Sequence, residues 1–282
     1  MPTDFHASFK LADGTVADIC ADAACGDVLE LLREVHSMSS LPGNNPLARI
    51  VPLTRGETHS IIAGSSRLQA EYPAGKLPEL YLRAMPADRI MQAAVSRNIM
   101  FLALLPLFRS ERMYLFHGGL AVDGHGHGCI ICGPSGVGKS TAVAKAGTIW
   151  EILSDDLLYL SFLDGRCFAQ PGPTWSTYLT EKARLVQCDI NRVVEVKNTV
   201  ILTRTGANGI RSVDGYMADL MLAGSFVDMT GWQALGINDN SIAVGLKKCA
   251  FNGTMRLSAA TKCHILTSEL ETDITPWLNS LE

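Results

Sequence analysis

The sequence predicts an α/β protein built on a mixed β-sheet with flanking helices. Two observations support this fold class. An apolar strand at 128–132 runs into a glycine-rich loop and then into a helical stretch that begins at Lys139. Short apolar strands recur on both sides of this unit, and Asp-Gly pairs of the kind that close hairpins join several of them. A strand, a tight loop and a helix in succession are typical of α/β folds.

The other elements follow from apolar periodicity and from turn residues. We expect a small α+β accessory region over residues 1–85 and a catalytic domain over residues 86–282, with the boundary near a long helix. The expected strands are Ala7–Ile19, Ala48–Leu53, Ser60–Ala63, Leu80–Arg83, Tyr114–Val122, Leu157–Leu163, Cys167–Ala169, Val193–Val196, Thr199–Leu202 and Cys263–Leu266. The expected helices are Asp27–Val35, Ala87–Leu105 (ended by Pro106), Val213–Leu222 and Ile242–Cys249.

The composition is that of an ordinary globular chain and excludes several classes of protein. The 282 residues are 47% apolar and 18% charged, and the formal net charge is −4. These values exclude a disordered or fibrous chain and do not indicate a nucleic-acid surface. No apolar run reaches the length of a membrane span, and the N-terminus lacks a signal-peptide core. We therefore expect a cytoplasmic protein with no nucleic-acid or membrane partner, and homo-oligomerisation stays open.

Two of the eight cysteines, Cys129 and Cys132, form a C-x-x-C pair inside the expected strand 128–132. A zinc site would need two more ligands at matching spacing. Residues three apart on a strand point to opposite faces of the sheet. We therefore favour two buried thiols over a redox or metal pair.

The strongest motif is the loop that follows this strand, which matches G-x-x-x-x-G-K-[ST] in full. Its glycines let the backbone wrap closely and point N–H groups inward, and the next helix adds a positive dipole end. Lys139 would bind the terminal phosphates, and the Ser140 hydroxyl would ligate Mg²⁺. The expected nucleotide-binding residues are Gly133, Pro134, Ser135, Gly136, Val137, Gly138, Lys139, Ser140 and Thr141.

An acidic pair, Asp155 and Asp156, ends the strand that returns after this helix. A nucleotide site needs a metal ligand, and transfer to a hydroxyl benefits from a base. Adjacent acids on an extended chain point to different sides, so one can face the metal and the other an incoming nucleophile. A metal ligand without a base role and a solvated turn are the alternatives.

Three histidines lie near the motif. His117 stands on the expected strand before the loop and is followed by two glycines, which would let a phosphate approach the backbone. A packed structural residue is the alternative. His125 and His127 fall in the turn after that strand, and we interpret them as exposed turn residues rather than metal ligands.

His117, the glycine-rich loop and the acidic pair follow one another in this order along the chain. This arrangement resembles the HPr kinase/phosphorylase family and, more remotely, ATP-dependent phosphoenolpyruvate carboxykinase. The matching stretch is HGGLAVDGHGHGCIICGPSGVGKST through ILSDD. The resemblance implies a phosphate-loop core of that superfamily, with ATP and Mg²⁺. By position, Lys139, His117 and Asp155 match catalytic residues, with Asp155 as the general base. Ser140 and Asp156 match the metal ligands.

A closer resemblance is to the small HPr-kinase-like proteins of the SynChlorMet cassette, which are encoded beside peptide-modification genes. They share a segment like Pro171-Gly172-Pro173-Thr174-Trp175-Ser176. A rigid turn that packs an indole explains this segment as well as a substrate contact does. The chain lacks the basic, glycine-rich C-terminal segment that HPr kinases use on their protein partner, so HPr is not the expected acceptor. Arg109 and Arg112 are the only nearby candidates for dicarboxylate ligands, so decarboxylation is not expected.

The resulting hypothesis is an ATP- and Mg²⁺-dependent kinase that phosphorylates a Ser or Thr hydroxyl of a peptide or protein. Two alternatives remain open. One is a nucleotide-binding regulator without turnover, and the other is a kinase of a free metabolite such as an amino acid.

Overall fold

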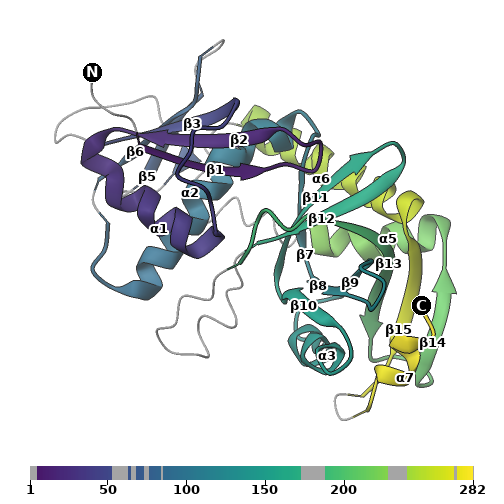
Figure 1. Cartoon of the computed structure of the whole chain (residues 1–282). Helices are drawn as coiled ribbons and strands as arrows, with labels where there is room; N and C mark the ends of the chain where they lie inside the picture. Colours follow the sequence, from purple (N-terminus) through teal and green to yellow (C-terminus); the bar gives the residue numbers. More distant parts are fainter. Residues whose placement is uncertain are drawn as a thin grey trace.

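The strands that the structure describes form two sheets, and one long helix links them. The computed structural model describes residues 5–52, 63–64, 68–72, 76–83, 85–172, 188–227, 240–269 and 272–281. Within these residues one sheet has six strands and the other nine (Figure 1). Helix α2 (Arg89–Arg109) follows the first sheet, and one apolar cluster runs through both sheets and this helix. The chain is a mixed α/β protein.

The six-stranded sheet has the order β1-β2-β3-β6-β5-β4, and α1 (Gly26–His36) packs on it. The single strand expected over Ala7–Ile19 is wrong, because the chain reverses within it. Gly14 has a φ of +84°, and the Leu11 amide donates to the Thr15 carbonyl at 2.8 Å, which closes an antiparallel hairpin. The strands are β1 (Phe5–Lys10), β2 (Val16–Ala21), β3 (Asn45–Pro52), β4 (Ala63–Gly64), β5 (Leu68–Glu71) and β6 (Glu79–Leu82), and η1 (Ala23–Cys25) precedes α1.

Helix α2 does not end at Pro106, as we expected from the sequence, but continues to Arg109. A proline has no N–H, so the carbonyl of Leu102, one turn earlier, loses its helical donor. The Tyr72 hydroxyl donates to that carbonyl at 2.8 Å. A side chain from the first sheet therefore satisfies the group that the proline leaves without a donor, and the helix can extend.

The nine-stranded sheet has the order β10-β8-β9-β13-β12-β11-β7, with β15 added to β13 and β14 to β15. Helices α3 and α7 share one apolar cluster with one face, and α5 and α6 pack on the other. Its strands are β7 (Tyr114–His117), β8 (Gly119–Val122), β9 (Gly128–Cys132), β10 (Glu151–Ser154), β11 (Leu157–Leu163), β12 (Arg166–Pro171), β13 (Val194–Thr203), β14 (Gly209–Val213) and β15 (Lys262–Thr267). The helices are α3 (Lys139–Ala146), α5 (Gly215–Val227), α6 (Asn240–Ala260) and α7 (Thr275–Asn279).

The strand expected over Tyr114–Val122 is broken at Gly118, so β7 pairs with β11 while β8 pairs with β9 and β10. A Cβ on Gly118 would lie 2.9 Å from the Phe116 ring and 3.0 Å from the Ile131 carbonyl. The Gly118 amide donates to the Asp156 carbonyl at 3.0 Å. At this break the chain passes from β7, at one end of the strand order, to β8, which lies next to the other end. His117 is the last residue of β7 and therefore lies at this break.

Residues 188–191 join the nine-stranded sheet to α1. The Cys188 amide donates to the Val35 carbonyl at 2.9 Å, and the Ile190 amide donates to the His36 carbonyl at 3.3 Å. The His36 ring is fully buried at this junction, with Nε2 3.3 Å from the Ser96 hydroxyl and Nδ1 3.8 Å from the Cys188 sulfur. Burial lowers the pKa of His36 from 6.5 to about 3. The ring is therefore neutral in the folded chain near pH 7.

His36 is expected to make the fold sensitive to acid. Between pH 6.5 and about 3 the unfolded chain binds a proton that the folded chain does not. The contribution of this ring is fully retained above pH 6.5 and falls by about 1.4 kcal/mol per pH unit below it. Urea unfolding of the wild type and of His36→Asn, compared at pH 7 and pH 5, measures this slope. The same pH dependence in both proteins would contradict the assignment, since asparagine does not titrate.

Gly253 on α6 is expected to be intolerant of a methyl group. A Cβ there would lie 2.6 Å from the Phe226 ring and 2.7 Å from the Tyr114 ring, both fully buried. Gly253→Ala should lower the free energy of unfolding by about 1–3 kcal/mol, measured by urea titration. Gly245→Ala on the same helix is the matched control, because its Cβ would meet open space. That control should gain roughly 0.5–1 kcal/mol from helix propensity, and equal losses in both variants would refute the steric explanation.

Candidate functional site

The glycine-rich loop between β9 and α3 has a backbone that only glycine adopts readily. Gly133, Gly136 and Gly138 have φ values of +146°, +76° and +99°. A Cβ on Gly133 would also lie 2.8 Å from the Leu202 carbonyl of the neighbouring strand. The loop therefore needs all three glycines for its conformation, and Gly133 for its packing as well. It leads directly into the first turn of α3.

Lys139 begins α3 and folds back over this loop. Its side chain is only 8% exposed, and Nζ donates to the Gly133 carbonyl at 3.0 Å and the Pro134 carbonyl at 3.2 Å. Ser140 and Thr141 follow in the first helical turn and are exposed. A buried ammonium held by carbonyls at a helix N-terminus is a suitable binding point for an anion, because phosphate oxygens can replace those carbonyls as acceptors.

The carboxyl ends of three parallel strands meet at this loop. Strand β13 pairs in parallel with both β9 and β15, so the residues that follow β13 lie beside the loop. Arg204 is one of them, and its Nε donates to the Val137 carbonyl at 3.1 Å. A second guanidinium nitrogen donates to the Gly136 carbonyl at 3.3 Å. The sequence analysis missed Arg204, and the signal that could have found it is its place just after a strand parallel to β9.

His117 and Asp156 are joined by a side-chain hydrogen bond across the end of the β7–β11 ladder. The distance from His117 Nε2 to Asp156 Oδ1 is 3.0 Å. Burial alone would raise the pKa of Asp156. The hydrogen bond with His117 and the charges of Lys139 and Arg97 outweigh that effect and hold this pKa below its ordinary value. The carboxylate is therefore ionised at neutral pH and lies within electrostatic reach of Lys139.

Asp155 precedes this pair, in the turn between β10 and β11, and is partly buried. Its Oδ1 atom is shielded from solvent. The neighbouring Ser154 hydroxyl fixes the turn by donating to the Leu157 carbonyl at 2.9 Å. The structure thus brings His117, Asp155 and Asp156 to one corner of the sheet.

Arg97 was also missed by the sequence analysis. It is the only charged residue between Arg89 and Arg109 in the sequence of α2, and a charge inside an apolar helix is a signal in itself. Partial burial lowers the pKa of Arg97, and the charge of Asp156 opposes this shift. The expected candidates for dicarboxylate ligands, Arg109 and Arg112, do not join this corner. Arg112 pairs with Asp13, and Arg109 ends α2, about 18 Å along the helix from Arg97.

The chemistry of these residues fits a nucleotide phosphate with a divalent cation. The loop amides, Lys139 and the start of α3 are suited to phosphate. The Ser140 hydroxyl and the Asp156 carboxylate are hard oxygen donors of the kind that Mg²⁺ prefers. The described residues contain no group of three or more His, Cys, Asp or Glu side chains arranged around a metal. The phosphate oxygens would have to complete the coordination of a metal held here.

The remaining candidates lie outside this corner. Cys129 and Cys132 belong to the apolar clusters on opposite faces of the sheet, and burial raises the pKa of Cys132 to about 12. Buried thiols are confirmed, and both sulfurs are free. His125 and His127 lie in the β8–β9 turn, where both backbone amides donate to Asp123 Oδ1. Pro173–Ser176 of the proposed substrate segment lie outside the described residues.

The fold and the site define a mixed α/β protein with a glycine-rich loop between β9 and α3. The model of the SynChlorMet cassette protein ScmC family matches residues 88–275. The chain belongs to this family. A search of curated proteins found no match. Within the part of the chain that the structure covers, no helix has the length and hydropathy needed to cross a membrane.

Proposed function

We propose that the chain is an ATP- and Mg²⁺-dependent kinase that transfers the γ-phosphate to a Ser or Thr hydroxyl of a peptide or protein. The observation that carries the proposal is the ionised Asp156 carboxylate, which contacts His117 and lies within electrostatic reach of Lys139 on a glycine-rich loop. A phosphate loop alone supports nucleotide binding. A loop that faces a second charged group supports stabilisation of charge on a transferred phosphoryl group.

Each residue has a role in the proposed reaction. Lys139 exchanges the carbonyls of Gly133 and Pro134 for phosphate oxygens. Ser140 and Asp156 would hold Mg²⁺, which neutralises charge on the terminal phosphates. Asp155 accepts the hydroxyl proton as the acceptor oxygen bonds to the γ-phosphorus, while the bond from that phosphorus to the bridging oxygen breaks and ADP leaves.

The proposal is supported by the family as well as by the site. The matched region, 88–275, contains Arg97, His117, the loop, the acidic pair and Arg204. The family is named after a cassette, and a protein of a gene cassette acts beside the products of its neighbours. A peptide or protein made or modified by those neighbours is therefore the acceptor class that we favour.

Mass spectrometry of acceptors incubated with the chain, ATP and Mg²⁺ tests this function. The panel contains Ser- and Thr-containing peptides encoded next to the gene, together with free L-serine and L-threonine. A gain of one phosphoryl group on a peptide, absent with Lys139→Ala, is the expected result. Transfer to the free amino acids alone would indicate a metabolite kinase. ATP binding without transfer to any acceptor in the panel would favour a regulator.

A further inference from the structure

A pocket lies beside the glycine-rich loop, on the side away from the acidic pair. Across this part of the sheet the strand order is β10, β8, β9, β13, β15 and β14. The turn with Asp155 and Asp156 follows β10, so it lies on one side of the loop that follows β9. The pocket lies on the other side, where β13 and β15 end, and has a volume of about 510 Å³. We call it the β13–β15 pocket.

The β13–β15 pocket begins directly next to the loop. Arg204, the residue after β13, donates to two backbone carbonyls of the loop. Its neighbours in sequence, Thr203 and Thr205, both line the pocket. The Thr203 hydroxyl fixes this stretch, because it accepts from the Thr205 amide at 3.3 Å. A molecule held at the loop by its phosphates therefore has this pocket as its neighbour.

One wall of the pocket is the face of the sheet that α5 covers. Successive residues of a strand point to opposite faces. Ile201 belongs to the apolar cluster that includes α5, whereas Leu202 belongs to the one that includes α3. Thr203 comes two residues after Ile201, and Thr267 is its register partner on β15. Both threonines therefore face α5, together with Ile265, which is the register partner of Ile201.

Two methionines of α5 form the opposite wall. Met217 is 52% exposed, and Met221 packs against the apolar cluster. Thioethers make favourable contacts with aromatic rings. Of the described residues that line the pocket, only Arg211 is charged, and its register partner on β15 is Ile265, whose face it shares. The pocket therefore combines an apolar slot for a flat ring with a positive charge that suits an anionic ligand.

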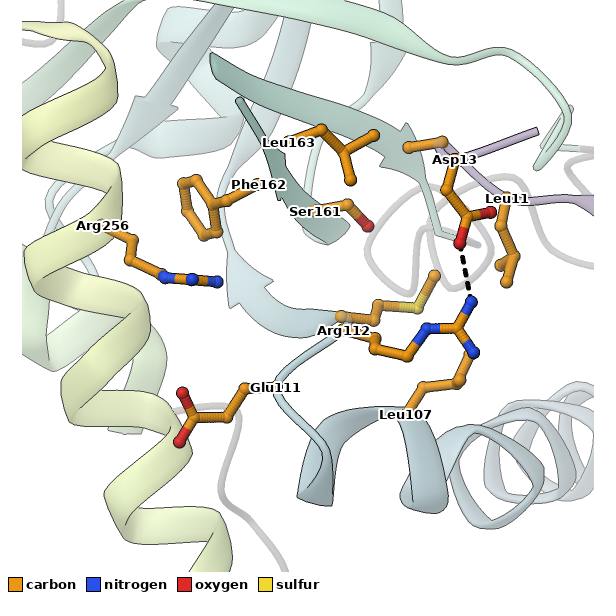
Figure 2. A pocket seen from close by; sticks show the side chains of 11 residues that line it. Leu11, Asp13, Leu107, Glu111, Arg112, Ser161, Phe162, Leu163 and Arg256 are labelled. Atoms are coloured by element: carbon orange, nitrogen blue, oxygen red, sulfur yellow. Dashed lines mark hydrogen bonds and ion pairs between the residues drawn. The ribbon is translucent and has the colours of Figure 1, made fainter. Parts of the chain in front are cut away.

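Two other cavities fit such a ligand less well. The groove between α3 and Glu269, on the opposite face of the sheet, encloses about 20 Å³. The pocket in Figure 2, of about 250 Å³, opens between the N-terminal hairpin, the end of α2 and α6. Ser161 in its lining lies roughly 16 Å along β11 from Asp156, at about 3.3 Å per residue. Of these three, the β13–β15 pocket alone adjoins the loop and reaches the usual volume of roughly 300–1,000 Å³ for a ligand pocket.

We propose that the β13–β15 pocket holds the nucleoside of the phosphoryl donor. The terminal phosphate must face the acidic pair for transfer to a hydroxyl, so the other end of the nucleotide extends toward β13 and β15. The purine ring would lie between Met217 and Ile265, and Arg211 would donate to a ring nitrogen. This inference rests on the nucleotide binding of the proposed function, and it adds the residues that recognise the donor beyond its phosphates.

Calorimetric titration of the full chain with ATP and with tripolyphosphate, both with Mg²⁺, tests the inference. Tripolyphosphate has the three phosphates of ATP but no nucleoside. Met217→Ala and Arg211→Ala should each raise the Kd for ATP about fivefold or more and leave the Kd for tripolyphosphate within about twofold. Both side chains are exposed, so both variants should fold, and their melting temperatures check this. Leu220→Ala is the matched control, because Leu220 is 57% exposed on α5 and does not line the pocket, so neither Kd should change.

The same titrations separate a failure of the pocket from a failure of the proposed function. Unchanged ATP affinity in both variants, with both ligands lost in Lys139→Ala, would overturn the pocket and keep the phosphate loop. An equal loss of both ligands in Met217→Ala and Arg211→Ala would also overturn the nucleoside assignment. Weaker ATP binding in Glu269→Ala but not in Met217→Ala would place the nucleoside in the groove beside α3. A wild type that bound neither ligand would refute the proposed function and this inference together.

Discussion

The Asp155→Asn variant is expected to bind ATP and Mg²⁺ like the wild type and to transfer the phosphoryl group roughly 10²–10⁴ times more slowly. The amide fills the same space in the β10–β11 turn but cannot accept the proton of the acceptor hydroxyl. Asp156 and Ser140 remain available to the metal. Calorimetry with ATP and Mg²⁺, together with single-turnover rates, separates binding from transfer.

The Asp156→Asn variant should behave differently. It removes an anionic oxygen from the proposed metal site and the partner of His117, so Mg²⁺-dependent nucleotide affinity should fall. Asp164→Asn is the control, since Asp164 lies in the β11–β12 turn with a left-handed φ of 51° that asparagine tolerates. The opposite pattern would mean that the two roles are exchanged. Complete loss of nucleotide binding in both variants would mean that neither aspartate acts as a base. The wild-type site would then only bind a nucleotide and its metal, without catalysing transfer.

Replacing Lys139 with alanine is expected to abolish most of the stabilisation of the fold by ATP and Mg²⁺. A ligand that binds only the folded state at a hundredfold excess over its Kd adds about 2.7 kcal/mol to the free energy of unfolding. Lys139 also holds the carbonyls of Gly133 and Pro134, so the variant can differ from the wild type without nucleotide. The informative quantity is therefore the rise in melting temperature on adding nucleotide, measured separately for each protein.

Lys197→Ala is the matched control for this measurement. Lys197 is an exposed lysine on β13 that pairs with Glu195, away from the loop. Its replacement should leave the rise in melting temperature unchanged. An equal rise in wild type, Lys139→Ala and Lys197→Ala would show that the glycine-rich loop is not where the nucleotide binds.

The elements best predicted from the sequence are those whose signals are local. The motif 133–140 predicted that β9 is followed by a loop and then by α3. The Asp-Gly pair at 164–165 predicted the β11–β12 hairpin. The same dipeptide at 13–14 marks another hairpin, which we overlooked because the flanking residues read as one strand. The segments expected at 193–196 and 199–202 are one strand, β13, because β9 and β15 pair along most of its length.

The features that the sequence could not predict depend on distant partners. The extension of α2 past Pro106 requires the Tyr72 hydroxyl, which is 30 positions away from Leu102. Arg97 and Arg204 reach the site from segments on either side of the motif, and no local pattern links them to it. The pocket shown in Figure 2 is similar, because its walls come from the N-terminal hairpin, the end of α2, β11 and α6.

The break at Gly118 has a consequence for the order in which the chain folds. The pairings of β7 with β11, β8 with β9, β10 with β8, and β11 with β12 all fall between residues 114 and 171. Pairings between nearby segments form faster than distant ones because they close shorter loops. We expect His117, the glycine-rich loop and the acidic pair to come together early, as one nucleus. Arg97 and Arg204 should be added later, when α2 and the end of β13 dock onto it.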